Sequence, residues 1–308
     1  MALKYLGTFD LPAHVKPGGF DHAAIHLRSQ RMYVAHTAND AVDVIDCAND
    51  RYLHSVPNLA GVAGVLVSDD RSLIFTSNHA EGTVGIFEPD DEGGLVRVDV
   101  RGRPNGLAYD SGRNLLLAAN VGDPSVPGSV TVSMVDVARR MMVASIPVPG
   151  RTRWALFDRR AEVFYVNITE PPQIVVIAAY DPSRVAGAWQ IPVLGPHGLD
   201  LDTEKRRLFC ACDGKKLIVL DADSGKGLNE ADLSGVPDVV FFNPVLNHLY
   251  IAIGDPGVID VFDTRVLKRI ETLPTGPGAH TIGFDGKRNR IYAFLPRTHC
   301  ATVYVDET

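Results

Sequence analysis

Short apolar segments alternate with polar turns along the whole chain. The clearest stretch is residues 195–225 (GPHGLDLDTEKRRLFCACDGKKLIVLDADSG), where a turn with Gly and Pro precedes three apolar segments separated by polar turns. Apolar side chains tend to recur at every second position, the period of a strand, and no segment has the period of an amphipathic helix. The pattern therefore predicts an all-β chain of short strands.

The same unit recurs seven times. Besides the stretch above, three further copies are clear, at residues 103–120, 236–253 and 278–294. Three copies are weaker, at residues 20–36, 62–78 and 151–167. We align the copies on the start of their second strand. The residue eleven places before that start begins the innermost strand of each copy, and we call it the mouth position. The seven mouth positions are Asp21, Ala63, Asn105, Thr152, His197, Asp238 and His280, at spacings of 42, 42, 47, 45, 41 and 42 residues.

Seven units of about 44 residues predict a seven-bladed β-propeller with four strands per blade. One small sheet cannot bury both of its faces, so each blade must pack on two neighbours, and a closed ring leaves no end blade uncovered. The last unit stops after its third strand (301–308), and residues 4–12 have strand character. We expect residues 4–12 to supply the missing outer strand beside 301–307, within one domain that spans 1–308. The alternative is an unpaired N-terminal tail.

The repeat consensus is roughly P-x-G-hhh-D-x-x-x-x-hYVAN-x-x-x-x-hhVID, where h is apolar. Residues 32–46 (MYVAHTANDAVDVID), 73–87 (LIFTSNHAEGTVGIF) and 163–170 (VFYVNITE) carry it most clearly. It resembles the YVTN repeat of YncE-like seven-bladed propellers over nearly the whole chain, and the WD and GH dipeptides of WD40 blades are absent. Members of this and neighbouring seven-bladed families include lactonases, lyases, muconate cycloisomerases and binding proteins, so the resemblance implies a fold rather than one activity.

Composition excludes several classes of partner. The net charge is −7, and no block of like charges forms the basic patch that a nucleic acid or an anionic membrane surface requires. The longest apolar runs fall far short of the roughly 20 residues of a membrane span. The N-terminal residues lack the apolar core of a secretory signal, and the four cysteines do not form a disulfide framework or a CxxC motif. We therefore expect a cytoplasmic protein whose partner is a small molecule.

The mouth positions place a set of titratable side chains beside the central channel. His197, Asp238, His280 and Asp21 belong to four consecutive blades of the closed ring, and His22 follows Asp21. Imidazole and carboxylate groups are the ligands of zinc, manganese and ferrous iron, so these four residues predict a site for a divalent metal ion. Without a metal, the same set predicts acid–base catalysis by a His beside an Asp. The alternative is a structural role, in which these side chains hydrogen-bond to ordered water.

The opposite side of the ring predicts substrate-binding residues. Arg153 stands where other units mostly have Gly, and it would pair with a substrate carboxylate, while Trp154 would offer a flat apolar wall. Arg103, Asn105 and His36, which ends the second strand of the first unit, complete the set of residues expected to bind substrate. Arg103 and the nearby Arg151 have an alternative role as solvated loop charges.

Two functions from different classes remain open. The first is an enzyme, a hydrolase, lyase or isomerase similar to a lactonase, that acts on a small anionic molecule at the His/Asp site, with or without a metal ion. The second is a propeller that binds a protein, peptide or metabolite on its rim without catalysis. No GxSxG, P-loop, GxGxxG or HExxH motif is present, and no CxxCH, so we expect no nucleotide, haem or flavin. An aromatic content of 7% does not favour an aromatic-rich binding rim, which leans the prediction toward the enzyme.

Overall fold

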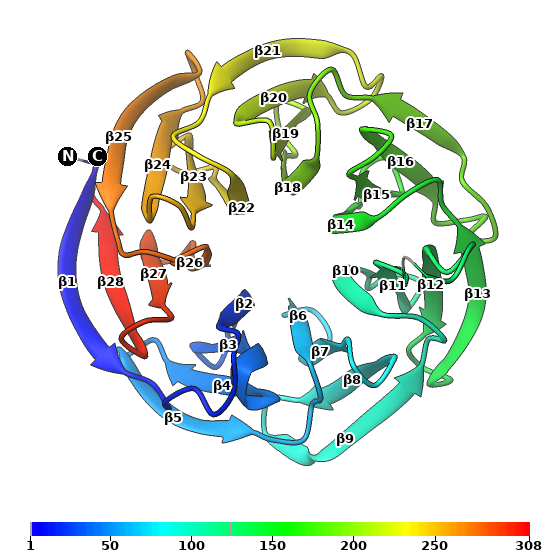
Figure 1. Cartoon of the computed structure of the whole chain (residues 1–308), viewed down its shortest axis with the longest axis horizontal. Coiled ribbons are helices and arrows are strands. Elements are labelled where there is room, and N and C mark those ends of the chain that lie inside the picture. Colours follow the sequence, from blue (N-terminus) through cyan, green and yellow to red (C-terminus); the bar gives the residue numbers. More distant parts are fainter. Residues whose placement is uncertain (1, 124) are drawn as a thin grey trace.

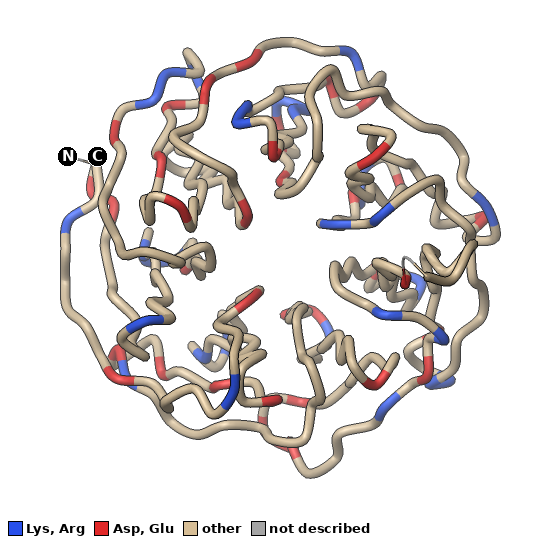
Figure 2. The backbone as a smooth tube through the Cα atoms, in the orientation of Figure 1, with Lys and Arg blue, Asp and Glu red and all other residues tan. Residues whose placement is uncertain are grey.

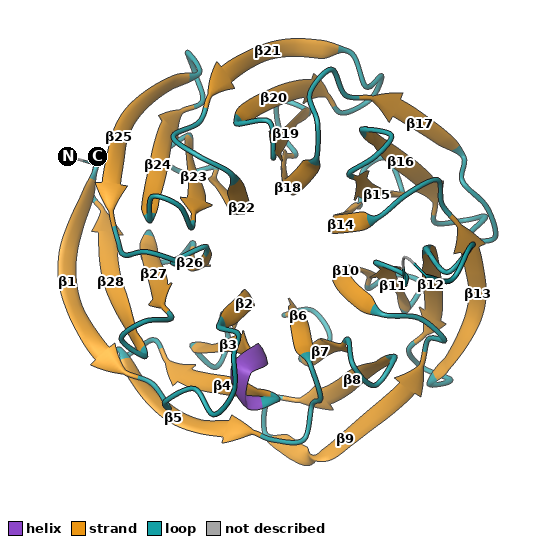
Figure 3. Ribbon diagram, in the orientation of Figure 1, coloured by secondary structure: helices purple, strands orange, loops and turns teal. Residues whose placement is uncertain are grey.

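Seven antiparallel sheets surround a central channel. A computed structural model describes residues 2–123 and 125–308 of the chain. It has seven four-stranded sheets arranged as the blades of a β-propeller, with one 3₁₀ turn, η1 (Thr37–Asn39), as the helical element of the described residues (Figures 1 and 3). No helix within this part of the chain has the length and apolar character to cross a membrane. The predicted seven-bladed, all-β fold is confirmed.

Each blade runs outward from the channel in chain order. Blades one to three contain β2 (Phe20–His26), β3 (Arg31–His36), β4 (Ala41–Asp46), β5 (Arg51–Val56); β6 (Val62–Ser68), β7 (Leu73–Asn78), β8 (Thr83–Glu88), β9 (Asp91–Asp99); and β10 (Pro104–Asp110), β11 (Leu115–Asn120), β12 (Thr131–Asp136), β13 (Met141–Pro147). Blades four to six contain β14 (Thr152–Asp158), β15 (Val163–Ile168), β16 (Gln173–Ala178), β17 (Gly187–Gln190); β18 (Pro196–Asp202), β19 (Arg207–Cys212), β20 (Lys216–Asp221), β21 (Gly227–Asp232); and β22 (Pro237–Asn243), β23 (His248–Ile253), β24 (Val258–Asp263), β25 (Lys268–Pro274).

Blade seven closes the ring by joining the two ends of the chain. Its inner strands are β26 (Thr281–Asp285), β27 (Arg290–Leu295) and β28 (Cys300–Asp306), and its outer strand is β1 (Leu3–Asp10). β1 pairs antiparallel with β28 from Leu3 opposite Asp306 to Asp10 opposite Cys300. The two termini therefore lie side by side (Figure 1), and the predicted closure by the N-terminal strand is confirmed to within two residues at each end.

The core lies between the blades rather than at the centre of the ring. Between blades five and six, for example, Phe209 and Phe242 pack with Ile251 in one buried cluster. Tyr33, Tyr165, Tyr250 and Tyr292, from four different second strands, are also fully buried. Because neighbouring blades bury each other's apolar faces, the core does not depend on the residues that point into the channel, and those residues can be polar.

The polar turns of the repeat have a shared backbone conformation. The residue before each second strand has a positive φ between 51° and 57° in every blade; these residues are Gln30, Ser72, Asn114, Glu162, Arg206, Asn247 and Asn289. In several turns the Asp that ends the first strand accepts backbone N–H bonds, as Asp110 does from Gly112 at 2.9 Å and Asp158 from Arg160 at 2.9 Å. This capping explains why the consensus places Asp at that point.

A glycine after the mouth position allows adjacent inner strands to approach closely. A Cβ atom on Gly198 would lie 2.2 Å from the carbonyl oxygen of Asp238, and one on Gly106 would lie 2.4 Å from that of Arg153. In blade four, Thr152 pairs with Ile168, which places Arg153, not Thr152, at the mouth position. Our alignment of this unit was therefore wrong by one residue, because the copy lacks the Pro and Gly that mark the turn elsewhere. It is Trp154, rather than Arg153, that replaces the glycine.

Candidate functional site

Five of the seven mouth positions place polar side chains around one small cavity at one end of the channel. Asp21, Asn105, Arg153, His197 and Asp238 line a small cavity of about 40 Å³, together with His22 and Trp154. Figure 2 shows basic positions at the inner end of β14, across the channel from acidic positions at the inner ends of β2 and β22. The structure therefore brings together side chains from five blades that lie up to 217 residues apart in the sequence.

His197 is held between two carboxylates. Its Nδ1 lies 2.7 Å from Oδ1 of Asp213, and its Nε2 lies 3.3 Å from Oδ1 of Asp238. Burial opposes a charge on the ring, but the negative charge of Asp238 and the hydrogen bonds with both carboxylates outweigh burial and raise the pKa of His197 to about 9. His197 is therefore an imidazolium at neutral pH, with an N–H directed at each carboxylate.

Asp238 is the carboxylate that connects the histidines. Burial works against its ionisation, yet the charges of His197 and His280 and the hydrogen bond from His197 lower the pKa of Asp238 well below its ordinary value. Asp21 behaves in the opposite way. Burial, with the nearby charge of Asp238, raises the pKa of Asp21, although His22 at 3.5 Å and the other histidines act against this rise. The two carboxylates of the mouth thus differ in their readiness to hold a proton.

His280 has a fixed tautomer and a free nitrogen. Its Nδ1–H donates to the carbonyl oxygen of Gly278 at 2.9 Å, so in the neutral ring the lone pair resides on Nε2. Nε2 lies 4.0 Å from Oδ2 of Asp238, too far for a hydrogen bond, and the side chain is 36% exposed. His280 is therefore oriented to accept a proton from a molecule in the channel mouth.

Arg153 lies in the opposite wall, and two exposed arginines, Arg103 and Arg151, lie near it. Arg153 lines the mouth cavity, and its buried Nε has no hydrogen-bond partner among the described residues. Burial and the positive charges of Arg153 and Arg103 lower the pKa of Arg151, which indicates that the three guanidinium groups lie within electrostatic reach of one another. In the part of the chain that the structure describes, none of the three forms an ion pair with a carboxylate. Such a cluster is suited to bind an anion.

His22 and Trp154 form the floor of the mouth. Their ring centroids lie 4.2 Å apart with the planes tilted by 40°. Both occupy the place that holds Gly64, Gly106 and Gly198 in three other blades, so two bulky rings narrow the channel at this level. The same two residues also line a larger cavity below, so the floor separates two compartments.

Two residues predicted to bind substrate do not line the mouth cavity, and one residue that contacts the site was missed. Arg103 is exposed and is not part of the lining. His36 is fully buried, and its Nδ1 lies 2.7 Å from Asp43 inside blade one, so the structure gives it a packing role rather than a place in the mouth cavity. Asp213, which orients His197, was not predicted. Asp213 directly follows β19, and the second strand of each blade ends at the same rim as the mouth position. A carboxylate at this place in the repeat is the signal that could have identified it.

The predicted metal centre does not fit the observed geometry. Among residues 2–123 and 125–308, no three or more His, Cys, Asp or Glu side chains are arranged to hold a metal ion. Each ring nitrogen of His197 faces a carboxylate, Nδ1 at 2.7 Å from Asp213 and Nε2 at 3.3 Å from Asp238, so neither nitrogen is directed at a shared position in the mouth. The mechanism below therefore uses no metal.

The fold defines the class of protein: a seven-bladed β-propeller, with a cluster of His, Asp and Arg side chains at one end of its channel. No protein-family model matches the chain, and no curated protein matches it. Among solved structures, the chain is similar to one titled "Kuenenia stuttgartiensis Hydrazine Synthase", with a TM-score of 0.79 and 13% identity over 95% of this chain and 96% of that chain. At this identity the similarity establishes the fold alone.

Proposed function

We propose that this chain is an enzyme of the YncE-like, YVTN-repeat kind that performs acid–base chemistry on a small anionic organic molecule at the mouth of the channel. The observation that carries the proposal is the division of the mouth. Arg153, with Arg103 and Arg151 within electrostatic reach and with no ion pair among the described residues, faces a group of His and Asp side chains whose pKa values are moved in different directions. If these side chains served only to hold water molecules in place, the mouth would not need positive charge on one side and groups with differently shifted pKa values on the other.

The geometry suggests a role for each group. Arg153, assisted by Arg103 and Arg151, holds the carboxylate of the substrate. His280 accepts a proton through Nε2, either from a carbon next to a carbonyl group or from an attacking water. His197 remains protonated and stabilises the negative charge that develops on a substrate oxygen. Asp238 and Asp213 fix the position and the charge of His197.

This division of labour is compatible with a hydrolase, a lyase or an isomerase. Lactone hydrolysis, ring-opening elimination and isomerisation all need an anchor for a carboxylate, a base and a cationic stabiliser of an oxyanion. The four cysteines are free thiols, which is consistent with the reducing environment of the cytoplasm. The competing function, a scaffold that binds ligands without turnover, does not require the tautomer control of His280.

Calorimetry with a panel of small mono- and dicarboxylic acids and their lactones tests the anion site, and NMR detects turnover. Arg153→Met should weaken carboxylate binding about 10- to 100-fold, because it removes charge-assisted hydrogen bonds from a partly buried site. The matched control is Arg139→Met, which removes an exposed arginine beside Asp136, away from the mouth, and should bind as the wild type does. Equal binding by Arg153→Met would contradict the proposal. Binding without any turnover would favour the scaffold.

A further inference from the structure

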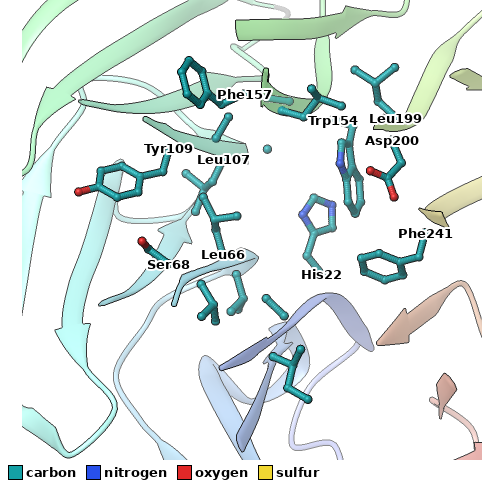
Figure 4. A pocket seen from close by; sticks show the side chains of 18 of the residues that line it. His22, Leu66, Ser68, Leu107, Tyr109, Trp154, Phe157, Leu199, Asp200 and Phe241 are labelled. Atoms are coloured by element: carbon teal, nitrogen blue, oxygen red, sulfur yellow. The ribbon is translucent and has the colours of Figure 1, made fainter. Parts of the chain in front are cut away.

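The lower half of the channel is a second compartment that the mouth chemistry does not use. It has a volume of about 520 Å³, within the range of small-molecule sites, and its walls come from the inner strands of all seven blades. Figure 4 shows His22, Trp154, Asp200 and Phe241 on one side of this space and Leu66, Ser68, Leu107 and Tyr109 on the other. We call this space the lower chamber.

The lower chamber opens on the face opposite the mouth. Its lining reaches Asp69, Asp70 and Arg159, which lie just beyond the ends of the inner strands. The side chains of Asp70 and Arg159 are 61% and 73% exposed, so this end meets solvent. At the other end the stacked rings of His22 and Trp154 separate it from the mouth. A molecule can therefore enter the chamber without passing the arginines.

The walls are mainly apolar and aromatic. Phe157, Phe241, Phe284, Tyr109 and Trp154 all contribute to the lining. Each of the three Phe side chains is only partly buried, although phenylalanine is usually buried in a core. Aromatic faces of this kind bind flat apolar molecules and attract cations.

Asp200 is the polar group that distinguishes this chamber. It lies on β18, and its Oδ2 accepts the backbone N–H of Phe242 at 2.6 Å, while its Oδ1 accepts that of Leu201 at 2.7 Å. No basic side chain of the described residues forms an ion pair with it. The one Lys or Arg of the described lining, Arg159, is already bonded to Asp70 and Ser111, each at 2.6 Å. The chamber thus holds a partly buried carboxylate without a cation.

We infer that the lower chamber is a binding site for a small aromatic or apolar amine, whose ammonium group pairs with Asp200 and whose ring packs against Phe241 and Trp154. The apolar volume selects the body of the ligand, and the unpaired carboxylate selects its charge. This site is separate from the proposed function of the mouth, and neither depends on the other.

Calorimetry with three probes that share one ring tests the inference: tryptamine, which is cationic, 3-methylindole, which is neutral, and indole-3-propionate, which is anionic. We expect tryptamine to bind with submillimolar affinity, at least tenfold more tightly than either of the others. Asp200→Asn keeps the size and one acceptor of the side chain and should weaken tryptamine binding at least tenfold. Leu66→Trp fills the chamber without touching Asp200 and should abolish binding.

The mouth supplies the control. Asp238→Asn removes a carboxylate above the floor and should leave tryptamine binding within twofold of the wild type. Loss of binding in Asp238→Asn with full binding in Asp200→Asn would place the amine in the mouth and overturn the inference. Equal affinity for the three probes, or no binding of tryptamine, would also overturn it. If Asp200→Asn does not fold, Leu66→Trp and the three-probe comparison decide the result.

Discussion

The two ends of the channel are built from the same inner strands, yet they carry opposite chemistry. The mouth presents Arg153 and a network of His and Asp, whereas the lower chamber presents aromatic rings and, among them, the carboxylate of Asp200 without an ion-pair partner among the described residues. The same repeated inner strand, one from each blade, runs past both the mouth and the lower chamber. The difference shows that the repeat determines where a side chain points, while individual substitutions in single blades determine what it does.

The floor between them illustrates this rule. Glycine after the mouth position is a packing device in blades two, three and five, because it admits the backbone of the next blade. His22 and Trp154 replace that glycine in blades one and four, and their rings meet between the two cavities. Two departures from the repeat therefore mark the boundary between the mouth cavity and the lower chamber.

The largest expected effect separates the two compartments by activity. On a carboxylate substrate that the wild type converts, His280→Gln should lower kcat about 10³-fold, because it removes the proton acceptor. Leu66→Trp should leave kcat within twofold, since it changes only the lower chamber. Steady-state kinetics of both variants measure this difference. Similar losses in both would show that the floor does not isolate the two halves.

A second effect concerns the mouth alone and its stability at alkaline pH. The pKa of His197 is raised in the folded state, so its stabilising contribution is complete below the unfolded pKa of about 6.5 and is lost as the pH rises through about 9. We expect about 3 kcal/mol of unfolding free energy to depend on this group at pH 6 and almost none at pH 10. Urea denaturation of the wild type and His197→Gln measures the difference. A difference that stays constant between pH 6 and pH 10 would refute the assignment.

A slightly smaller effect belongs to the lower chamber and falls in another pH range. Burial raises the pKa of Asp200 to about 6, against the backbone N–H bonds from Phe242 and Leu201. The folded state therefore binds this proton more tightly than the unfolded state, and stability decreases as the pH rises from about 4 to about 6. Asp200→Asn should be more stable than the wild type by about 3 kcal/mol at pH 8, and this gain should vanish below pH 4. Thermal unfolding at both pH values tests the prediction. A gain that persists at pH 4 would show that the carboxylate is not its cause.

The sequence by itself determined the repeat architecture. Period-two segments, a spacing of about 44 residues and a third strand without a partner were sufficient to predict seven blades closed by residues 4–12, because strand pairing and blade packing are local and recur in each unit. It also indicated that His197, Asp238 and His280 share one rim, since equivalent positions in a ring must face the same channel.

Only the tertiary structure decided how those side chains interact. Asp213 lies beside His197 across two different turns, and the ring of His22 contacts that of Trp154 across two different blades. The carbonyl oxygen of Gly278 fixes the tautomer of His280 within one turn, through a backbone conformation that the sequence pattern does not specify. The one-residue error in blade four arose where the Pro and Gly markers of the repeat are missing. The lower chamber had no sequence signature, because the carboxylate of Asp200 and the rings around it follow the ordinary alternation of a strand. Their arrangement around one cavity depends on the radius of the closed ring, which no single repeat encodes.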